Sequence, residues 1–237
     1  MFYFDKINNK KILKSDLIQN AFFTTRESVI KTKEIGIKDI AQKNLEEIKE
    51  FLDVKKLIHP NQRHTGNIDI ADINKEIYEE TDALILTDKN IGIYLNFADC
   101  TPLIFYDEEK NIGAISHAGW RGTVEMIGVK TVLRMQNDFG CNLKNIKAII
   151  GPSICASCFE VGYDVYNKLY QTINMPKTDK EKAFADLKEI NRIQLEQIGI
   201  EQIDVCPYCT SCNNDLFFSY RKEEGTTNRH SAILILK

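Results

Sequence analysis

The sequence predicts a mixed α/β fold with sheet at the centre and helices outside it. Short runs rich in Ile, Leu, Val and aromatic residues recur along the chain, as expected of strands. Segments with helical periodicity lie between them. The two patterns interleave without a strict strand–helix–strand repeat. Because 237 residues suit one large core, we expect a single domain over residues 1–237.

The individual elements follow from these patterns in chain order. The expected strands cover residues 20–24, 56–59, 83–86, 91–97, 103–106, 112–116, 146–150, 203–205 and 233–236. The expected helices cover residues 40–52, 124–138, 163–172 and 186–198. In the first helix Ile40, Leu45 and Ile48 share one face. Gly140 and Gly199 follow the second and the fourth helix, as C-cap glycines do.

Composition and charge exclude several classes of protein. Apolar residues make up 43% and charged residues 27%, which is ordinary for a soluble globular chain. The net charge is −3 and the basic residues do not gather in one tract, so we expect no nucleic-acid partner. No apolar run is long enough to span a bilayer, and the N-terminus lacks the order of a signal peptide. The seven cysteines are therefore expected to be reduced thiols in a cytoplasmic protein.

Reactive residues gather at the ends of the strands in the middle of the chain. Asp99 and Cys100 lie between two expected strands, and His117 follows a third, next to Gly119. Such positions are typical of sites built on a rigid sheet. Two histidines and one cysteine form a catalytic zinc set with an open fourth position, and His64 is the second candidate histidine. From the residue types alone, hydrogen-bonded histidines and a packed cysteine explain the pattern equally well.

Two further cysteine-based interpretations arise. A blue-copper site also uses two His and one Cys with a weak axial ligand, but the nearest methionine, Met126, lies in an expected helix. Five other cysteines have spacings suited to a second, structural metal, and this possibility stays open. They are Cys155, Cys158, Cys206, Cys209 and Cys212.

Several strings in the sequence resemble a known family. Ala98-Asp99-Cys100-Thr101-Pro102 and His117-Ala118-Gly119-Trp120-Arg121-Gly122 resemble the signature of the YfiH family, also called the laccase-domain or multicopper polyphenol oxidoreductase family. Further similar segments are residues 62–64, 81–84, 151–154, 158–161, 209–210 and 217–221. The resemblance runs from about residue 20 to the C-terminus. It departs from the family after Arg26, where a Gly-Gly pair is absent, and at Asn228, where glycine is usual.

The resemblance implies a metal site made of His64, Cys100 and His117 in an α/β/β/α layered sandwich. Members are described as purine nucleoside phosphorylases that act on adenosine, inosine and methylthioadenosine, and some also deaminate adenosine. The older description is laccase, and some bacterial members are linked to editing of peptidoglycan precursors. A multicopper cluster needs many histidines, whereas this chain has four and no His-x-His pair, so copper is expected at most as a single ion.

Further side chains are candidates for substrate contacts and acid–base chemistry. Arginine forks match phosphate geometry, which makes arginines candidate phosphate or ribose partners. The candidate substrate-binding residues are Arg121, Arg221, Arg229, Gln62 and Glu160, and Trp120 is a candidate for stacking on the base. Asp99 and Glu160 are candidates for moving a proton or for orienting a metal-bound histidine.

We therefore predict a zinc-dependent purine nucleoside phosphorylase, with adenosine deaminase activity as a further expectation. The expected partners are a purine nucleoside and phosphate, and the expected state is a monomer or weak homo-oligomer. The alternatives are a single-copper polyphenol oxidase, a hydrolase with Cys100 as nucleophile and His117 as base, such as a peptidoglycan-precursor editing amidase, and a metal-dependent binding module.

Overall fold

Two six-stranded sheets form the centre of the protein in the computed structural model, which describes residues 1–236. In spatial order the first sheet contains β1 (Phe2–Ile7), β2 (Lys10–Ser15), β3 (Ile18–Thr24), β14 (His230–Ile235), β7 (Ile91–Phe97) and β4 (Lys56–Ile58). The second contains β13 (Gln202–Val205), β10 (Ile146–Ile150), β8 (Thr101–Asp107), β9 (Ile112–Ala118), β6 (Ala83–Leu86) and β5 (Ile68–Ile70). Most neighbouring strands are antiparallel, and β4–β7, β5–β6 and β10–β13 are parallel.

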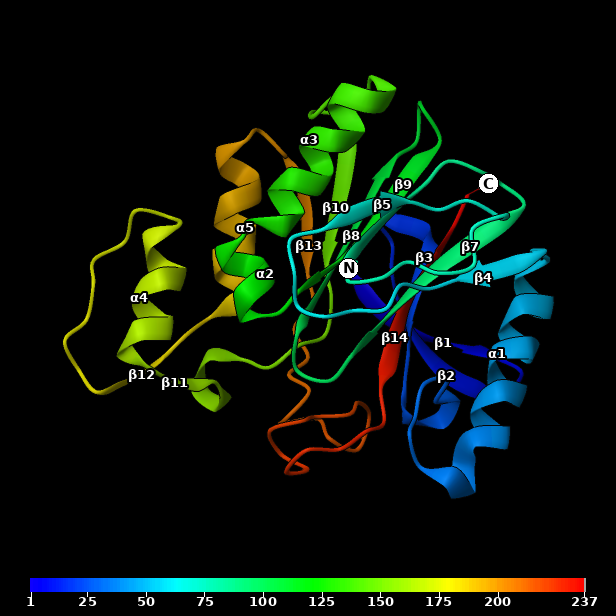
Figure 1. The fold of residues 1–237 in the computed structure, drawn as a ribbon, viewed down its shortest axis with the longest axis horizontal. Helices are drawn as coiled ribbons and strands as arrows, with labels where there is room; N and C mark the ends of the chain where they lie inside the picture. Colours follow the sequence, from blue (N-terminus) through cyan, green and yellow to red (C-terminus); the bar gives the residue numbers. More distant parts are fainter. Residues whose placement is uncertain (237) are drawn as a thin grey trace.

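The two sheets pack face to face through a shared apolar core that includes Phe23, Leu95 and Ile104. Helix α1 (Lys38–Leu52) covers the outer face of the first sheet, where Ile48 packs on Tyr94 and its neighbours. Helices α3 (Ile127–Phe139) and α5 (Leu187–Gln197) cover the outer face of the second sheet (Figure 1). The expected mixed α/β fold and its α/β/β/α layering are confirmed.

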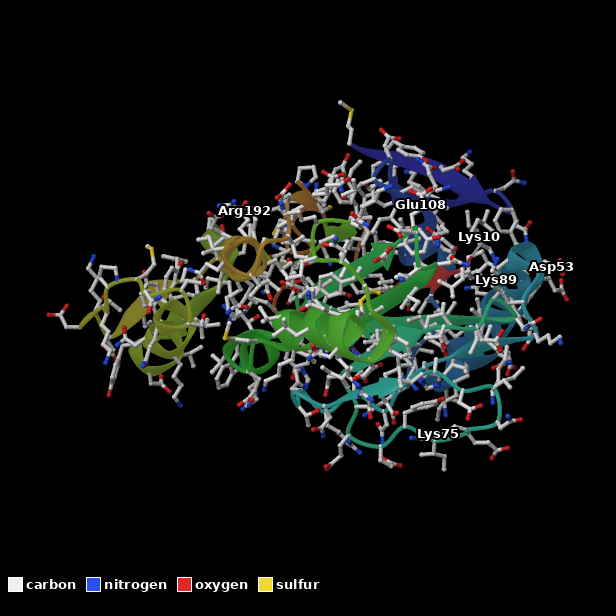
Figure 2. All side chains as sticks on the ribbon, turned by 90° about the horizontal axis from the view of Figure 1, so that it is seen from above. Lys10, Asp53, Lys75, Lys89, Glu108 and Arg192 are labelled. Atoms are coloured by element: carbon white, nitrogen blue, oxygen red, sulfur yellow. The ribbon has the colours of Figure 1, made fainter. Side chains whose placement is uncertain are left out.

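The view from above separates the two helical layers (Figure 2). Arg192 marks α5 on one side, and Asp53, which caps the end of α1, lies on the other. Beyond α5, helix α4 (Tyr163–Gln171) forms the end of the molecule, together with the ribbon of β11 (Glu160–Gly162) and β12 (Lys182–Phe184). The remaining short helices are α2 (Trp120–Val124), η1 (Arg26–Ser28), η2 (Ile35–Ile37) and η3 (Ala156–Cys158). Within residues 1–236, no helix is both long and apolar enough to cross a bilayer.

All nine expected strands are present, three of them with the expected limits: residues 83–86, 91–97 and 146–150. Five strands were not expected, namely β1, β2, β5, β11 and β12. Those segments are short or mix apolar residues with Lys, Asp and Ser. Strands β1 and β5 lie at sheet edges, β11 and β12 form a separate ribbon, and β2 lies next to the edge strand β1.

The helix expected over residues 124–138 is present as α3, Ile127–Phe139, and Gly140 is its C-cap as expected, but the helix begins three residues later. A separate short helix, α2, precedes it, and Met126 between the two has a left-handed backbone with φ of 54°. Helix α2 begins directly after β9, and Gly122 lets it return against that strand, because a Cβ there would lie 2.7 Å from the His117 carbonyl oxygen. Trp120 and Arg121 open α2 just after β9, whereas the expected helix began only at residue 124.

Candidate metal centre

His64, Cys100 and His117 come together at one end of the second sheet. Cys100 directly precedes β8 and His117 lies near the end of β9, and the antiparallel pairing of Pro102 with His117 brings them side by side. His64 arrives on the loop that precedes β5. The donor atoms of the three side chains all lie within 4.8 Å of one another.

The spacing suits a single metal ion. Cys100 Sγ lies 3.8 Å from His64 Nε2, and the His64 and His117 rings are 4.8 Å apart between centroids. Zinc bonds of about 2.3 Å to sulfur and about 2.0 Å to nitrogen place two tetrahedral ligands about 3.5 Å apart. Gly119 leaves the space for this approach, because a Cβ there would lie 2.7 Å from Cys100 Sγ and 3.3 Å from His64 Cδ2. Two imidazoles and a thiol, held this close, fit zinc or a single copper ion.

Asp82 orients both histidines. Its carboxylate is fully buried and accepts a hydrogen bond from His117 Nδ1 at 2.8 Å, which leaves Nε2 of that ring as the free donor atom. The other carboxylate oxygen accepts bonds from the backbone N–H groups of Arg63 and Thr65 and from the Thr65 hydroxyl. These bonds hold the loop on both sides of His64, whose backbone is left-handed with φ of 62°.

The sequence offered Asp99 or Glu160 for orienting a histidine, and it gave no role to Asp82. The signal was a lone carboxylate directly before the buried strand β6, which pairs with β9. Residues 82 and 117 are neighbours only through that pairing, and the backbone N–H of His117 also donates to the Asp82 carbonyl at 2.8 Å.

The charges of the three groups stabilise one another. Burial disfavours charge on the Cys100 thiol, but His117 and His64 outweigh it and lower the pKa of Cys100 to about 6. Burial also lowers the pKa of His117, but the nearby Cys100 and Asp82 outweigh it and raise that pKa to about 9. Burial raises the pKa of Asp82, yet its bond to His117 brings the value to about 2. In the metal-free protein at neutral pH, Cys100 is therefore a thiolate beside an imidazolium.

Asp99 supports the turn that carries Cys100. Its backbone is left-handed with φ of 81°, and its carboxylate accepts bonds from Thr210 Oγ1 at 2.6 Å and from the Arg221 N–H at 2.7 Å. Its carbonyl oxygen accepts a bond from the Ile154 N–H at 3.1 Å. Asp99 thus joins two distant loops to the position before Cys100.

The remaining candidate residues lie at different places around the centre. The side-chain amide of Gln62 donates a hydrogen bond to the Asn96 carbonyl oxygen and accepts one from the Asn96 N–H. Glu160 pairs with Lys182 at 2.8 Å on the exposed β11–β12 ribbon. Their contacts with a substrate stay predictions.

The three arginines differ in their surroundings. Arg221 donates to the carbonyl oxygens of Cys158 and Glu160, and Arg229 donates to those of Thr226 and Asn228. Burial lowers the pKa of the Arg229 guanidinium, whereas the charges of Cys100, Tyr220 and Asp99 oppose this effect. Arg121 stacks on the Trp120 ring, with its guanidinium carbon 4.3 Å from the ring centroid.

A cleft of about 400 Å³ opens beside His64. Its lining residues are His64, Thr65, Gly66, Trp120, Arg121, Val124, Glu125 and Lys168. The volume lies within the range usual for small-molecule sites, and the lining combines the Trp120 ring with two cations, Arg121 and Lys168, and one carboxylate, Glu125. Lys168 was not expected here, because α4 reaches the cleft only through its packing against α2 and α5.

The sequence pattern of one family, described as multi-copper polyphenol oxidoreductase laccase, matches residues 36–237. The chain belongs to this family. Purine nucleoside phosphorylase YlmD of Bacillus subtilis is 38% identical to this chain over 164 residues, or 66% of this chain. The match spans only 59% of that relative's length. Adenosine deaminase RL5, from an unknown prokaryotic organism, is 34% identical over 190 residues, or 72% of this chain and 71% of the relative.

A solved structure extends the likeness to the whole fold. The hypothetical protein YfiH of Bacillus licheniformis superimposes with a TM-score of 0.86 over 99% of both chains, at 27% identity. The resemblance to the YfiH group of the laccase family is therefore confirmed.

Replacing Gly119 with alanine is expected to weaken zinc binding by about ten- to a hundred-fold, the range usual when a group that positions a metal ligand is altered. The added Cβ would overlap Cys100 Sγ and press on the His64 ring. Gly36→Ala is the matched control, since nothing lies within 4 Å of a Cβ there. Competition titration with a zinc indicator measures both variants. Equal zinc affinity in both would show that the glycine is not needed for the approach of these ligands.

Proposed function

We propose that this protein is a zinc-dependent purine nucleoside phosphorylase that acts on adenosine, inosine and methylthioadenosine, with adenosine deamination as a second activity of the same site. The observation that carries the proposal is the cluster of His64, Cys100 and His117 together with a cleft that His64 lines, beside Trp120, Arg121 and Lys168. The names of the two relatives support the same pair of reactions.

Phosphorolysis makes defined demands on the site. The bond between C1′ of the ribose and N9 of the purine breaks, its electron pair leaves with the base, and a phosphate oxygen forms the new bond to C1′. The site must therefore hold an anion, position the base and supply a proton to it. Zinc held by His64, Cys100 and His117 would supply Lewis-acid polarisation.

The residues around the cleft can meet these demands. Arg121 and Lys168 offer positive charge for phosphate, and the ring of Trp120 offers a face for the purine. Arg229, whose charge interacts with those of Cys100 and Asp99, is proposed as a third cation of the site. Asp99 keeps the Cys100 turn in place, so it acts on the reaction through the position of that ligand. Arg221, Gln62 and Glu160 are proposed to act in the walls around the bound nucleoside.

The proposal also covers the metal ion, the location of the protein and its oligomeric state. Zinc is favoured over copper because two imidazoles and one thiolate form a known catalytic zinc set. A reducing, cytoplasmic location is supported by seven free cysteines. The substrates are small molecules, and a monomer or weak homo-oligomer is proposed.

Product analysis tests the proposed reaction. Inosine incubated with protein and phosphate is expected to yield hypoxanthine and ribose 1-phosphate, separable by chromatography, and His64→Ala is expected to form neither. Adenosine without phosphate is expected to yield inosine and ammonia. His59→Gln is the control, because this histidine packs on Tyr94 beneath α1, outside the centre. If none of the three nucleosides is converted by zinc-loaded protein, the proposal fails and a binding module is favoured.

One observation favours a second candidate function. The thiolate of Cys100 beside protonated His117 is also the arrangement of a cysteine hydrolase. In that case the metal-free protein would be the active form.

A further inference from the structure

Four cysteines outside the candidate metal centre lie together. Cys155 and Cys158 flank the turn of η3, and Cys209 and Cys212 lie on the loop that follows β13. Their four sulfur atoms all lie within 4.8 Å of one another. We call this group the four-cysteine cluster. Cys206, which has a similar spacing in the sequence, is not a member.

The backbone brings the two Cys-x-x-Cys segments into register. Ser153 and Cys209 form an isolated parallel bridge, and the Thr210 N–H donates to the Ser153 carbonyl at 3.2 Å. The Cys158 and Cys212 sulfur atoms are 3.5 Å apart. Zinc–sulfur bonds of about 2.3 Å place the sulfurs of a tetrahedral site about 3.8 Å apart. The cluster is therefore close to the size that a zinc ion requires.

Backbone N–H groups already point at one of these sulfurs. The Cys155 and Cys212 N–H groups donate to Cys209 Sγ at 3.3 and 3.4 Å. Hydrogen bonds to a sulfur stabilise its thiolate form, which is the form that binds metal. Packing of neutral thiols as small apolar groups gives no reason for two such donors to converge on one sulfur.

A buried lysine is a second indication that the four-cysteine cluster carries negative charge. Lys188 is only 8% exposed, and its ammonium donates to the carbonyl oxygens of Cys206 and Tyr208. Within residues 1–236 it forms no ion pair with a carboxylate. Burial lowers the pKa of Lys188, and the nearby Cys206, Cys209, Asp186 and Cys155 oppose this effect. A buried charge needs a counter-charge. Four thiolates around one divalent ion carry a net negative charge and would supply part of it, in addition to the Asp186 carboxylate.

We infer that Cys155, Cys158, Cys209 and Cys212 bind a second zinc ion, and that this ion is structural. Four thiolates fill a tetrahedral zinc and leave no open position for a substrate. The second zinc fastens the loop after β13 to the segment after β10. Thr210, next to Cys209, bonds to Asp99, and Arg221 donates to the Cys158 carbonyl. The second zinc therefore supports the walls beside Cys100 without taking part in the reaction, and the inference does not depend on the proposed function.

Metal content of the whole chain, purified in reductant without chelator, tests this inference. Mass spectrometry of the metals is expected to find about two zinc ions per chain. Cys155→Ser/Cys209→Ser is expected to lose one of them, and Cys100→Ser the other. Cys206→Ala is the matched control on the same loop and is expected to keep both. Cobalt in the Cys100→Ser protein is expected to show the strong absorption of tetrahedral thiolate ligation.

The wild-type protein provides a test that does not require a folded variant. Stepwise titration with a mercurial, in the presence of a zinc indicator, is expected to release one zinc as the cluster thiols react. The inference is overturned if wild-type protein holds zinc only at the centre containing Cys100. It is equally overturned if the four thiols are found as disulfides in reductant-free cytoplasmic extract, or if iron occupies the cluster. The readout of this test is the number of zinc ions per chain and not nucleoside turnover, so its result is independent of the proposed reaction.

Discussion

Cys100→Ser is expected to lose the zinc of the candidate metal centre and to lower kcat/KM for inosine phosphorolysis by at least about a thousand-fold. A serine hydroxyl stays protonated at neutral pH and does not replace a thiolate ligand. His64 and His117 would remain as the two imidazole donors, without the thiolate between them. Metal analysis and steady-state kinetics on the same preparations measure the two effects together.

Cys141→Ser is the matched control for this prediction. Cys141 is buried beneath α3, and burial raises the pKa of its thiol to about 12, so it is an unreactive core residue. Its variant is expected to keep zinc and activity. The opposite interpretation makes Cys100 a nucleophile. It would be supported if chelated wild-type protein stayed active and if iodoacetamide, which reacts with thiolates, abolished that activity at pH values above about 6.

The grouping of His64, Cys100 and His117 could be predicted because each lies in a short string that resembles those of the YfiH family. His117 stands directly before Ala118 and Gly119, and Cys100 stands in the turn between two strongly apolar strands. The groups that position them could not be predicted in the same way. Asp82 reaches His117 through the pairing of β6 with β9, and Lys168 reaches the cleft through the packing of α4.

Secondary structure could likewise be predicted where the local sequence pattern is strong, and not where contacts between distant segments decide it. Strands β6, β7 and β10 are buried along nearly their whole length, so their continuous apolar runs marked both ends. Strands β1 and β2 lie at one edge of the first sheet and carry several lysines, so their pattern was weak. Helix α2 packs against the end of β9, and the chain breaks at Met126 before α3 begins. Helical periodicity in the sequence does not reveal such a contact between α2 and a strand.

Asp82→Asn is expected to weaken zinc binding by about a hundred-fold and to lower kcat/KM with it, although the side chain keeps its size. One oxygen of Asp82 accepts bonds from two backbone N–H groups and the Thr65 hydroxyl, and the other accepts from His117 Nδ1. An asparagine that keeps its oxygen on the loop turns its NH₂ group toward His117. Nδ1 must then accept, so the ring proton moves to Nε2, which is the atom needed for the metal.

The prediction separates Asp82 from other carboxylates that are equally buried. Asp107 is also fully buried and accepts bonds from the Lys110 and Asn142 N–H groups at the far end of β8, so Asp107→Asn is expected to leave zinc affinity unchanged. Zinc competition titrations compare the variants, and ¹⁵N spectra of the histidine rings report the His117 tautomer. Wild-type zinc affinity in Asp82→Asn, with the proton still on Nδ1, would contradict the orienting role. The Asp99 carboxylate holds the Cys100 turn and does not touch a histidine ring. A larger loss of zinc affinity in Asp99→Asn than in Asp82→Asn would therefore show that the position of Cys100 matters more for zinc binding than the orientation of His117.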